Sequence, residues 1–516
     1  MQPHKREKQT FFSIKNGKTN NTASIKKRFI GNLNSFLIFL QIIFTHPHQY
    51  TTNRMAPQTL DFDNMSTRHL FRKIFFPTLM GMFAGSVMNV TDGIFVGRRI
   101  GSDALAAINI TAPVFMLVTG IALMFGIGAS VRASIALAEG RKQEADREIT
   151  SALAASSAIV VIMSVIFMLF PNQLGSLFGS TQALIPLVRE YMLWITPGML
   201  FSCIMFSGMF YVRLDGAPKF AMWCELLSTG LNILLDYLFI YPLNMGIMGA
   251  AAASSISCIV GGTMILIYML FFTKRIHLIN ITTIIATGEN IANRLWKQCK
   301  LGLSGLLGEV GISLMLVSGN YVFVHLAGED GVAAYSIACY GTPLFFMINN
   351  AIAQAAQPIV SYDYGARRKE RVRSTLHLSL TVAIACSIAT TILICLFAEP
   401  LVKLFVDEKS CATFDIAREG MPLFALGLLF MAINITFIGY LQSVKCGFQA
   451  SIFTVLRAYV FLIISFVLLP EICGIKGAWL AIPTAEALTS LCIILFATIR
   501  LNSHILIKKQ SKNNDF

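Results

Sequence analysis

The chain contains few charged residues, and this scarcity limits what kind of protein it is. Only 13% of its 516 residues are Asp, Glu, Lys or Arg, whereas 55% are hydrophobic and the mean hydropathy is +0.66. A water-soluble domain usually carries about 25% charged residues. The composition therefore excludes an ordinary soluble protein and indicates a membrane protein.

Motifs for several kinds of chemistry are also missing. The eleven cysteines are scattered singly without a CxxC pair, so neither a disulfide framework nor a zinc site is indicated. All eight histidines lie outside the expected membrane spans or at their ends, which leaves no histidine cluster inside the membrane. No GxxxxGK[ST] loop is present, which argues against a pump driven by nucleotide hydrolysis. We therefore expect no enzyme activity, no structural metal site and no cofactor.

What the sequence does contain is a series of long apolar stretches. A helix needs about 20 mostly apolar residues to cross the hydrocarbon core of a bilayer. Twelve stretches meet this requirement, at residues 74–96, 104–130, 149–170, 191–212, 220–241, 246–272, 301–326, 332–359, 375–397, 421–444, 448–469 and 477–499. The sequence therefore predicts an all-α membrane protein with twelve transmembrane helices.

Positive charge is distributed unevenly between the two sides of the membrane. The net charge is +14, and from residue 65 onwards 24 Lys and Arg residues fall in the segments on one side, several times as many as on the other. Basic residues that flank membrane spans stay on the cytoplasmic side. The bias predicts a multi-pass protein of the plasma (inner) membrane with cytoplasmic N- and C-termini. The basic charge sets orientation and gives no reason to expect nucleic acid as a partner.

The two halves of the chain resemble each other. Three short segments of the first half recur in the second half at a nearly constant distance. They are GSDALAA (Gly101 to Ala107) and GEDGVAA (Gly328 to Ala334), 227 residues apart; GIMGAA (Gly246 to Ala251) and GIKGAW (Gly474 to Trp479), 228 apart; and, more weakly, residues 139–147 and 364–372, 225 apart. Each repeat holds six spans, an even number, so the halves share one orientation. They are therefore expected to be related by a pseudo-two-fold axis along the membrane normal, with a cavity between them.

The repeat defines the expected domains. Residues 65–272 form an N-terminal lobe of six helices, and residues 301–500 form a C-terminal lobe of six more. Residues 273–300, the longest polar stretch between spans, are expected to be a cytoplasmic linker, and residues 501–516 a cytoplasmic tail.

Residues 1–64 have a different composition from the rest. They carry nine Lys or Arg residues and one apolar run, residues 29–44, which is too short to cross a membrane comfortably. We interpret them as a disordered extension, or as the result of an upstream start codon with Met65 opening the working protein. A helix on the membrane surface is a further alternative.

Two carboxyl groups lie inside apolar spans. A charge at the bilayer centre costs about 2.5–3.5 kcal/mol on insertion scales, so Asp92 and Asp236 are expected to face a cavity and handle ions or protons. With a rise of about 1.5 Å per residue, both fall in the outer half of the first lobe, as does Ser254. Asn232 lies one helical turn before Asp236 on the same face. These four groups offer oxygen atoms that suit a proton or a small cation.

The second half provides a control for this prediction. The positions 228 residues after Asp92 and Asp236 hold Asn320 and Ile464, so the pair has no counterpart there. Glu309 is the second lobe's own buried acid, but it lies only about 12 Å from the cytoplasm and is instead a candidate for the substrate cavity. Three further charged residues within spans are expected to lie near an interface or to be internally paired: Glu225, Arg457 and Glu486.

Several of these patterns together resemble the multidrug and toxic compound extrusion (MATE) transporters, and the similarity extends over about residues 65–500. The patterns are P-x14-D followed by GxxxG (Pro77, Asp92, Gly93, Gly97), the LNxxLD-to-GxxGAA block (Leu231 to Ala251) and AAQPIVSYDYGARRKERV (Ala355 to Val372). The resemblance implies a secondary active antiporter that exports amphipathic, often cationic compounds in exchange for protons or sodium by alternating access. It also implies a monomer embedded in membrane lipid.

The resemblance assigns roles to individual residues. It implies that Asp92, Asn232 and Asp236 form the coupling-cation site and that Ser254 matches a hydroxyl residue of the family. Pro77 matches the proline at which the first helix bends during the cycle. The chain departs from branches with a second-lobe cation site, because residues 421–444 contain no acid.

Other functions are weighed against export of this kind. A flippase for lipid-linked saccharides, from the same broad superfamily, would have a similar architecture but a more cationic cavity for pyrophosphate. A membrane-embedded enzyme would need clustered His, Ser or Cys near an interface, and the sequence shows no such cluster.

Overall fold

The computed structural model describes residues 60–178, 180–286, 288, 290–403 and 411–513, and within these ranges the chain forms helices and no strands. The helical membrane fold predicted from the apolar stretches is therefore confirmed.

The chain divides into two compact units. Among the described residues, one unit runs from residue 60 to residue 277 and from residue 290 onwards, and it holds both predicted lobes. The other includes the described residues of the range 278–288, with the short helix α9 (Ile281–Ala286).

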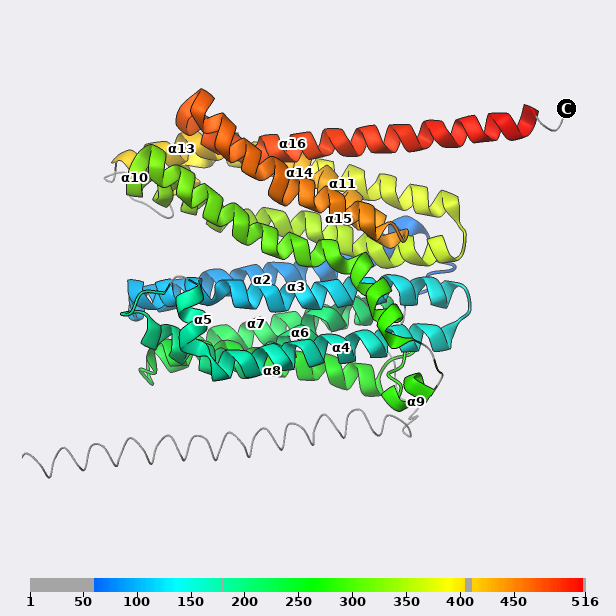
Figure 1. Ribbon diagram of the computed structural model, residues 1–516, viewed down its shortest axis with the longest axis horizontal. Coiled ribbons are helices and arrows are strands. Elements are labelled where there is room, and N and C mark those ends of the chain that lie inside the picture. Colours follow the sequence, from blue (N-terminus) through cyan, green and yellow to red (C-terminus); the bar gives the residue numbers. More distant parts are fainter. Residues whose placement is uncertain (1–59, 179, 287, 289, 404–410, 514–516) are drawn as a thin grey trace, which may run out of the picture. The chain divides into compact units, whose positions relative to one another are not determined.

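Six long helices form the first lobe, which occupies the lower half of Figure 1. They are α2 (Thr67–Arg99), α3 (Ser102–Ala138), α4 (Lys142–Leu169), α6 (Ile185–Leu214), α7 (Pro218–Ile240) and α8 (Gly246–Phe271), with the short α5 (Pro171–Leu177) between α4 and α6.

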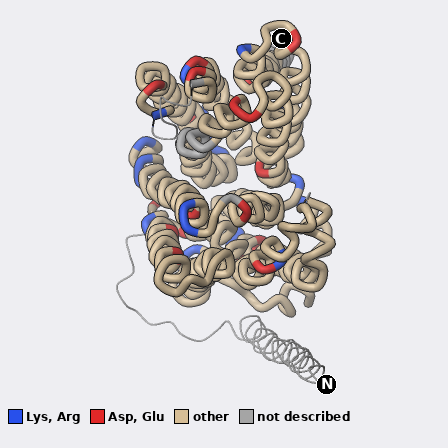
Figure 2. Tube along the Cα trace, turned by 90° about the vertical axis from the view of Figure 1, so that its left-hand side faces the viewer, with Lys and Arg blue, Asp and Glu red and all other residues tan. Residues whose placement is uncertain are grey.

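The second lobe lies above the first in Figure 1 and is built from helices that follow in the chain. They are α10 (Ile291–Gly365), α11 (Lys369–Leu396), α12 (Ala398–Lys403), α13 (Cys411–Ala425), α14 (Gly427–Ser443), α15 (Gly447–Val455), the π-helical turn η1 (Leu456–Val460) and α16 (Phe461–Asn513). Seen along the helices in Figure 2, the tubes gather into an upper and a lower group, and most of the trace carries no charge.

Ten helices of the described chain are long and apolar enough to cross a membrane. Two of them contain a sharp bend, at Ala327 and Gly328 in α10 and at Gly474 in α16, where the backbone leaves helical geometry. Each bend separates two of the predicted spans, so the ten helices account for all twelve. Each bend falls on the first glycine of a repeated segment, GEDGVAA at Gly328 and GIKGAW at Gly474. The bend connects one membrane crossing to the next.

Four glycines at equivalent places adopt the left-handed backbone region. Gly101 has φ 115° and its repeat partner Gly328 has φ 61°, while Gly246 has φ 60° and its partner Gly474 has φ 57°. A side chain would strain these turns, because residues other than glycine seldom adopt positive φ. The repeated glycines therefore mark matching turns between helices of the two lobes, at the end opposite the predicted linker.

The backbone corrects the alignment of the third, weaker similarity. Gly140 has φ 76° at the turn after α3, and the residue with positive φ at the turn after α10 is Arg367, with φ 57°. These two are 227 residues apart, two more than the sequence similarity suggested. Likewise Gly216, with φ 96°, corresponds to Lys445, with φ 64°. The second lobe uses non-glycine residues here, which is why the sequence alone hides the match.

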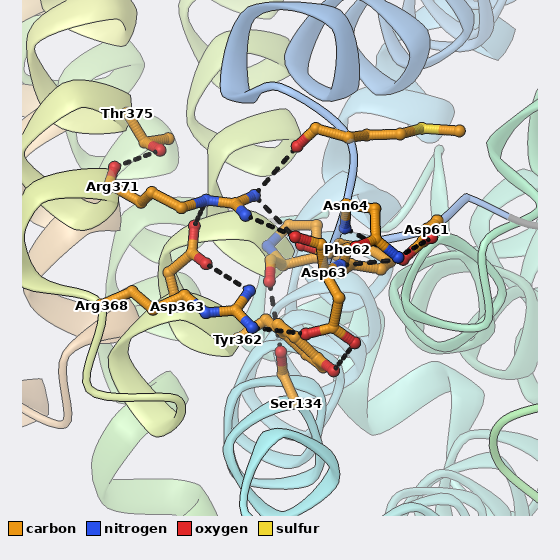
Figure 3. Close-up of polar contacts among 12 residues, drawn as sticks. Asp61, Phe62, Asp63, Asn64, Ser134, Tyr362, Asp363, Arg368, Arg371 and Thr375 are labelled. Atoms are coloured by element: carbon orange, nitrogen blue, oxygen red, sulfur yellow. Dashed lines mark hydrogen bonds and ion pairs between the residues drawn. The ribbon is translucent and has the colours of Figure 1, made fainter.

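The folded body begins before residue 65, where the sequence analysis placed the end of the extension. Leu60 and Phe62 are buried, with 5% and 1% of their surfaces exposed. Figure 3 shows the segment 60–65 seated against the ends of α10 and α11, with Asp63 receiving hydrogen bonds from Tyr362 (2.9 Å) and Arg368 (2.8 Å). Residues 60–64 therefore pack into the folded body, although they fall within the extension expected over residues 1–64.

The same segment touches both lobes. Arg275, which follows α8 of the first lobe, donates to the Leu60 carbonyl at 2.6 Å and lies over the Phe62 ring at 4.9 Å. From the second lobe, Arg371 donates to the carbonyl oxygens of Phe62 (3.0 Å) and Met65 (3.2 Å). Segment 60–65 therefore bridges the lobes at the predicted cytoplasmic end.

A buried ion cluster lies at this end as well. Glu148 of α4 is fully buried and accepts from Arg132 of α3 (2.7 Å), Arg294 (2.8 Å) and Gln298 (2.6 Å). Arg294 and Gln298 lie in the first turns of α10, which begins at Ile291, inside the predicted linker. The last ten residues of that linker are thus helical and packed against the first lobe.

Candidate functional site

The buried face of α7 carries a line of polar side chains. Glu225, Ser228, Thr229, Asn232 and Asp236 are all buried and recur at three- or four-residue spacing. Residues spaced in this way share one face of a helix. The helix thus presents a polar stripe to its neighbours α2 and α8 within an otherwise apolar lobe.

Asp92 of α2 meets the outer end of this stripe. Its carboxyl group lies close enough to that of Asp236 to form a hydrogen bond when one of them is protonated. Asp236 is fully buried, and neither of its oxygens accepts a hydrogen bond from any described residue; the same is true of Asp92 Oδ1. The structure thus brings together two acids that the sequence placed 144 positions apart.

Asn232 and Ser254 complete the predicted group. Asn232 Nδ2 donates to Ser254 Oγ of α8 at 3.3 Å, while Asn232 Oδ1 is buried and has no hydrogen-bond donor in the described chain. Tyr191, near the start of α6, lies within electrostatic range of both Asp92 and Asp236. The sequence analysis did not select Tyr191, whose position as the first residue of a predicted span was its only signal.

The unsatisfied oxygens define what this cluster can do. Buried polar atoms are nearly always hydrogen-bonded, and each exception calls for an explanation such as an absent proton or ion. Two adjacent carboxylates in a low dielectric repel each other and lose their hydration. A shared proton or one small cation would remove both penalties, and the oxygens of Asp92, Asn232 and Asp236 are suitable ligands.

Pro77 lies in a part of α2 that packs against both lobes. Before it, Phe71 and Phe75 belong to an apolar cluster formed largely with α10 and other helices of the second lobe, and after it Leu79 and Met82 pack against the same cluster. Gly81 packs against Glu225 of α7, whose Cβ lies 3.5 Å from the point that a Cβ on the glycine would occupy. The helix that carries Asp92 therefore contacts the second lobe on both sides of its proline and the first lobe after it.

Glu309 lies apart from the aspartate pair. It lines a cavity of about 100 Å³ whose walls come from α3 and α6 of the first lobe and from the second-lobe segments α10, α14, α15 and η1. The polar lining consists mainly of neutral side chains: Ser304, Asn350, Gln354, Gln357, Gln442 and Thr454. Glu309 and Arg457 are the charged residues of this lining.

In the second lobe Glu486 is a buried acid that is neutralised. Glu486 of α16, 4% exposed, lies 2.5 Å from Arg457 Nε of η1 and accepts a hydrogen bond from Asn434 of α14 at 2.6 Å. Ser490 in turn donates to Asn434 at 2.8 Å. Of the two alternatives expected for these residues, Arg457 and Glu486 are internally paired, with each other, whereas Glu225 forms no ion pair within the described residues.

Comparison with known families places this arrangement among transporters. The sequence model of the MatE family matches the chain twice, at residues 77–238 and 306–467. The two matches contain the same number of residues and cover most of both lobes, which agrees with the internal repeat.

Curated relatives and solved structures agree with this match. The chain is 24% identical over 431 residues to the multidrug export protein MepA of Staphylococcus aureus (strain N315), covering 81% of this chain and 91% of that protein. It is 24% identical over 439 residues to MepA of Staphylococcus haemolyticus (strain JCSC1435), covering 83% and 94%. A solved structure described as the outward-facing conformation of a multidrug resistance MATE family transporter is 22% identical, with a TM-score of 0.80 and coverage of 87% and 99%. At that identity the structural likeness establishes the fold.

Proposed function

The chain belongs to the MatE family of multidrug and toxic compound extrusion transporters, and from this membership we propose that it exports amphipathic organic compounds in exchange for protons or sodium. It is a multi-pass membrane transporter and not an enzyme. The names of its curated relatives support multidrug efflux as the activity.

The observation that carries the antiport proposal is the un-neutralised acid pair of the first lobe. Asp92 and Asp236 are adjacent, and their buried oxygens have no donor in the described chain. A charge at this depth is retained only where it has a function. We assign Asp92, Asn232 and Asp236 to the coupling cation, with Ser254 orienting the asparagine amide and no cofactor taking part.

The packing of α2 supplies a way for this site to act on the cavity. When a proton or sodium ion enters, repulsion between Asp92 and Asp236 ends and the outer half of α2 can move towards α7. Pro77 removes one backbone hydrogen bond and so permits a bend between the first turns of α2 and the part that carries Asp92. In the proposed cycle this bend squeezes the cavity and drives substrate outward, and the two lobes then alternate in access.

The charges that line the cavity suit a neutral or cationic substrate better than a substrate that carries a pyrophosphate group. Arg457 is the basic residue of the lining, and its charge is already matched by Glu486. Glu309 forms no ion pair with another described residue, and it is the residue we assign to a cationic group of the substrate. A flippase for lipid-linked saccharides would need several unmatched cations here, so we favour drug export.

The charge distribution supports a plasma-membrane protein with cytoplasmic termini. Lys and Arg residues concentrate in the turns beside segment 60–65 and the linker, as expected for cytoplasmic loops. We propose that a single chain is the working unit, since one chain holds both lobes, the cation site and the cavity.

Transport in reconstituted vesicles tests the proposal. The purified protein is placed in vesicles with a fluorescent cationic dye, and Na⁺ and pH gradients are imposed independently. Dye flux that follows one of these gradients is expected. A rate of dye flux that changes with neither gradient would contradict antiport.

A further inference from the structure

A second pocket, at the opposite end of the molecule from the aspartate pair, is lined by basic residues. It has a volume of about 480 Å³ and receives four cationic side chains: Arg132 of α3, Lys297 and Lys300 of α10, and Lys445 of the turn before α15. No carboxylate is among its lining residues. The three lysines form no ion pair within the described chain, whereas Arg132 is paired with Glu148.

Close packing of α15 on α10 fixes the walls of this basic pocket. Gly447, the first residue of α15, packs so closely on α10 that a Cβ there would lie 2.4 Å from the Lys300 carbonyl oxygen. No side chain caps α15, and its first three residues, Gly447, Phe448 and Gln449, line the pocket. The first amide groups of a helix have no intrahelical partners and attract negative charge. Burial, and then the charges of Arg132 and Arg141, lower the pKa of Lys445. The lysine charges and this helix end together favour an anion.

Apolar side chains continue outward from the pocket. On α10, Trp296 and Leu303 flank Lys300 at helical spacing and are 67% and 37% exposed. On α15, Phe448 and Ile452 are one turn apart and are 60% and 41% exposed. Such exposure suits contact with acyl chains, and tryptophan is enriched at the membrane interface. A soluble anion would gain nothing from these side chains.

We propose that this basic pocket binds the phosphate group of an anionic phospholipid from the cytoplasmic leaflet. Basic pockets between transmembrane helices on that side are a recurring means of lipid recognition. The pocket takes Arg132 from the first lobe and its lysines from the second, so one headgroup would contact both lobes. The sidedness rests on the proposed orientation, while binding itself does not depend on transport.

Lipid binding by the purified protein in detergent tests the inference. Phosphatidylglycerol and phosphatidylcholine are titrated separately and followed by native mass spectrometry and by thermal stability. The variant Lys297→Gln/Lys300→Gln/Lys445→Gln is compared with Lys142→Gln/Lys219→Gln/Lys369→Gln, which removes the same charge from exposed lysines outside the pocket. An unchanged melting temperature without lipid establishes that each variant is folded.

The parent should prefer phosphatidylglycerol, and the pocket variant should bind it on the order of 100-fold more weakly, since each basic residue near the surface contributes about a factor of five to ten. The control variant should stay within about twofold of the parent. Equal loss in both variants would show general charge attraction and overturn the proposal, as would full binding by the pocket variant. Inorganic phosphate that stabilises the protein as strongly as the lipid would assign the pocket to a soluble anion instead.

Discussion

The two lobes share a backbone plan, but the Asp92–Asp236 pair of the first lobe and Glu486 of the second lobe have opposite surroundings. In the first lobe, Asp92 and Asp236 face each other and lack donors in the described chain. In the second, Glu486 is held by Arg457 at 2.5 Å and by Asn434 at 2.6 Å. A neutralised acid has no need of an external cation, whereas an un-neutralised pair does. A duplicated fold can thus hold an un-neutralised acid pair in one copy and a fixed internal ion pair in the other.

The largest effect is expected from neutralising the first-lobe pair. Asp236→Asn should abolish gradient-driven dye export, because one coupled charge moving through 100 mV supplies about 2.3 kcal/mol, roughly a 50-fold gradient. Dye accumulation in vesicles under imposed Na⁺ and pH gradients measures this loss. Glu486→Gln is the matched change in the second lobe, and gradient dependence should survive in it. If the two variants lose coupling equally, the proposed contrast between the lobes is wrong.

Stability should change in opposite directions in the two lobes. Arg457→Met leaves Glu486 buried without its cation and should destabilise the protein by about 3–5 kcal/mol. Arg457→Met/Glu486→Gln removes both charges and should recover most of that loss. Asp92→Asn, by contrast, should leave stability unchanged or raised, because it ends a repulsion. Thermal unfolding in detergent measures all three, and a destabilised Asp92→Asn variant would argue for a purely structural carboxylate.

The missing backbone hydrogen bond at Pro77 should affect the rate of export more than the affinity for dye. Pro77→Ala restores the missing backbone hydrogen bond and should stiffen α2 between the lobes. Dye export is expected to slow several-fold, with dye binding to the detergent-solubilised protein unchanged. Pro113 lies inside α3 and provides a control, since Pro113→Ala should alter export less. Equal effects of the two substitutions would remove the special role of Pro77.

The smallest expected effects come from the turns with positive φ. Arg367→Gly relieves an unfavourable φ of 57° and should stabilise the protein by about 1 kcal/mol, whereas Gly140→Ala at the equivalent first-lobe turn should destabilise it by a similar amount. Arg367→Ala controls for the lost charge. Melting temperatures that change in the same direction for both turns would break the structural equivalence of residues 140 and 367.

Much of the fold could be predicted from the sequence because apolar length and charge bias are properties of single segments. The twelve spans and the repeat follow from such local patterns, whereas the pairing of Arg457 with Glu486 depends on the fold. The bends at Gly328 and Gly474 could be anticipated only as turns, since glycine permits positive φ without requiring it. Arg367 and Lys445 give no such signal in the sequence. The turns of the second lobe that match Gly140 and Gly216 are therefore recognised only from their backbone angles.

The site was predictable only in part for a related reason. Buried carboxylates are rare enough for Asp92 and Asp236 to stand out, and helical spacing adds Asn232. Tyr191 could not be found in this way, because an aromatic residue at the start of a span is common. Phe62 was missed because its burial depends on residues far away in sequence, Tyr362 and Arg275, rather than on any local period.

The most direct test of the first-lobe cation site is cation binding to the purified protein in detergent, measured as ²²Na⁺ binding and as proton uptake on acidification. One cation should bind per chain in the parent and in Glu486→Gln, and none in Asp92→Asn or Asp236→Asn. Unchanged binding by both aspartate variants, or its loss in Glu486→Gln alone, would contradict the assignment of the coupling cation to the first lobe.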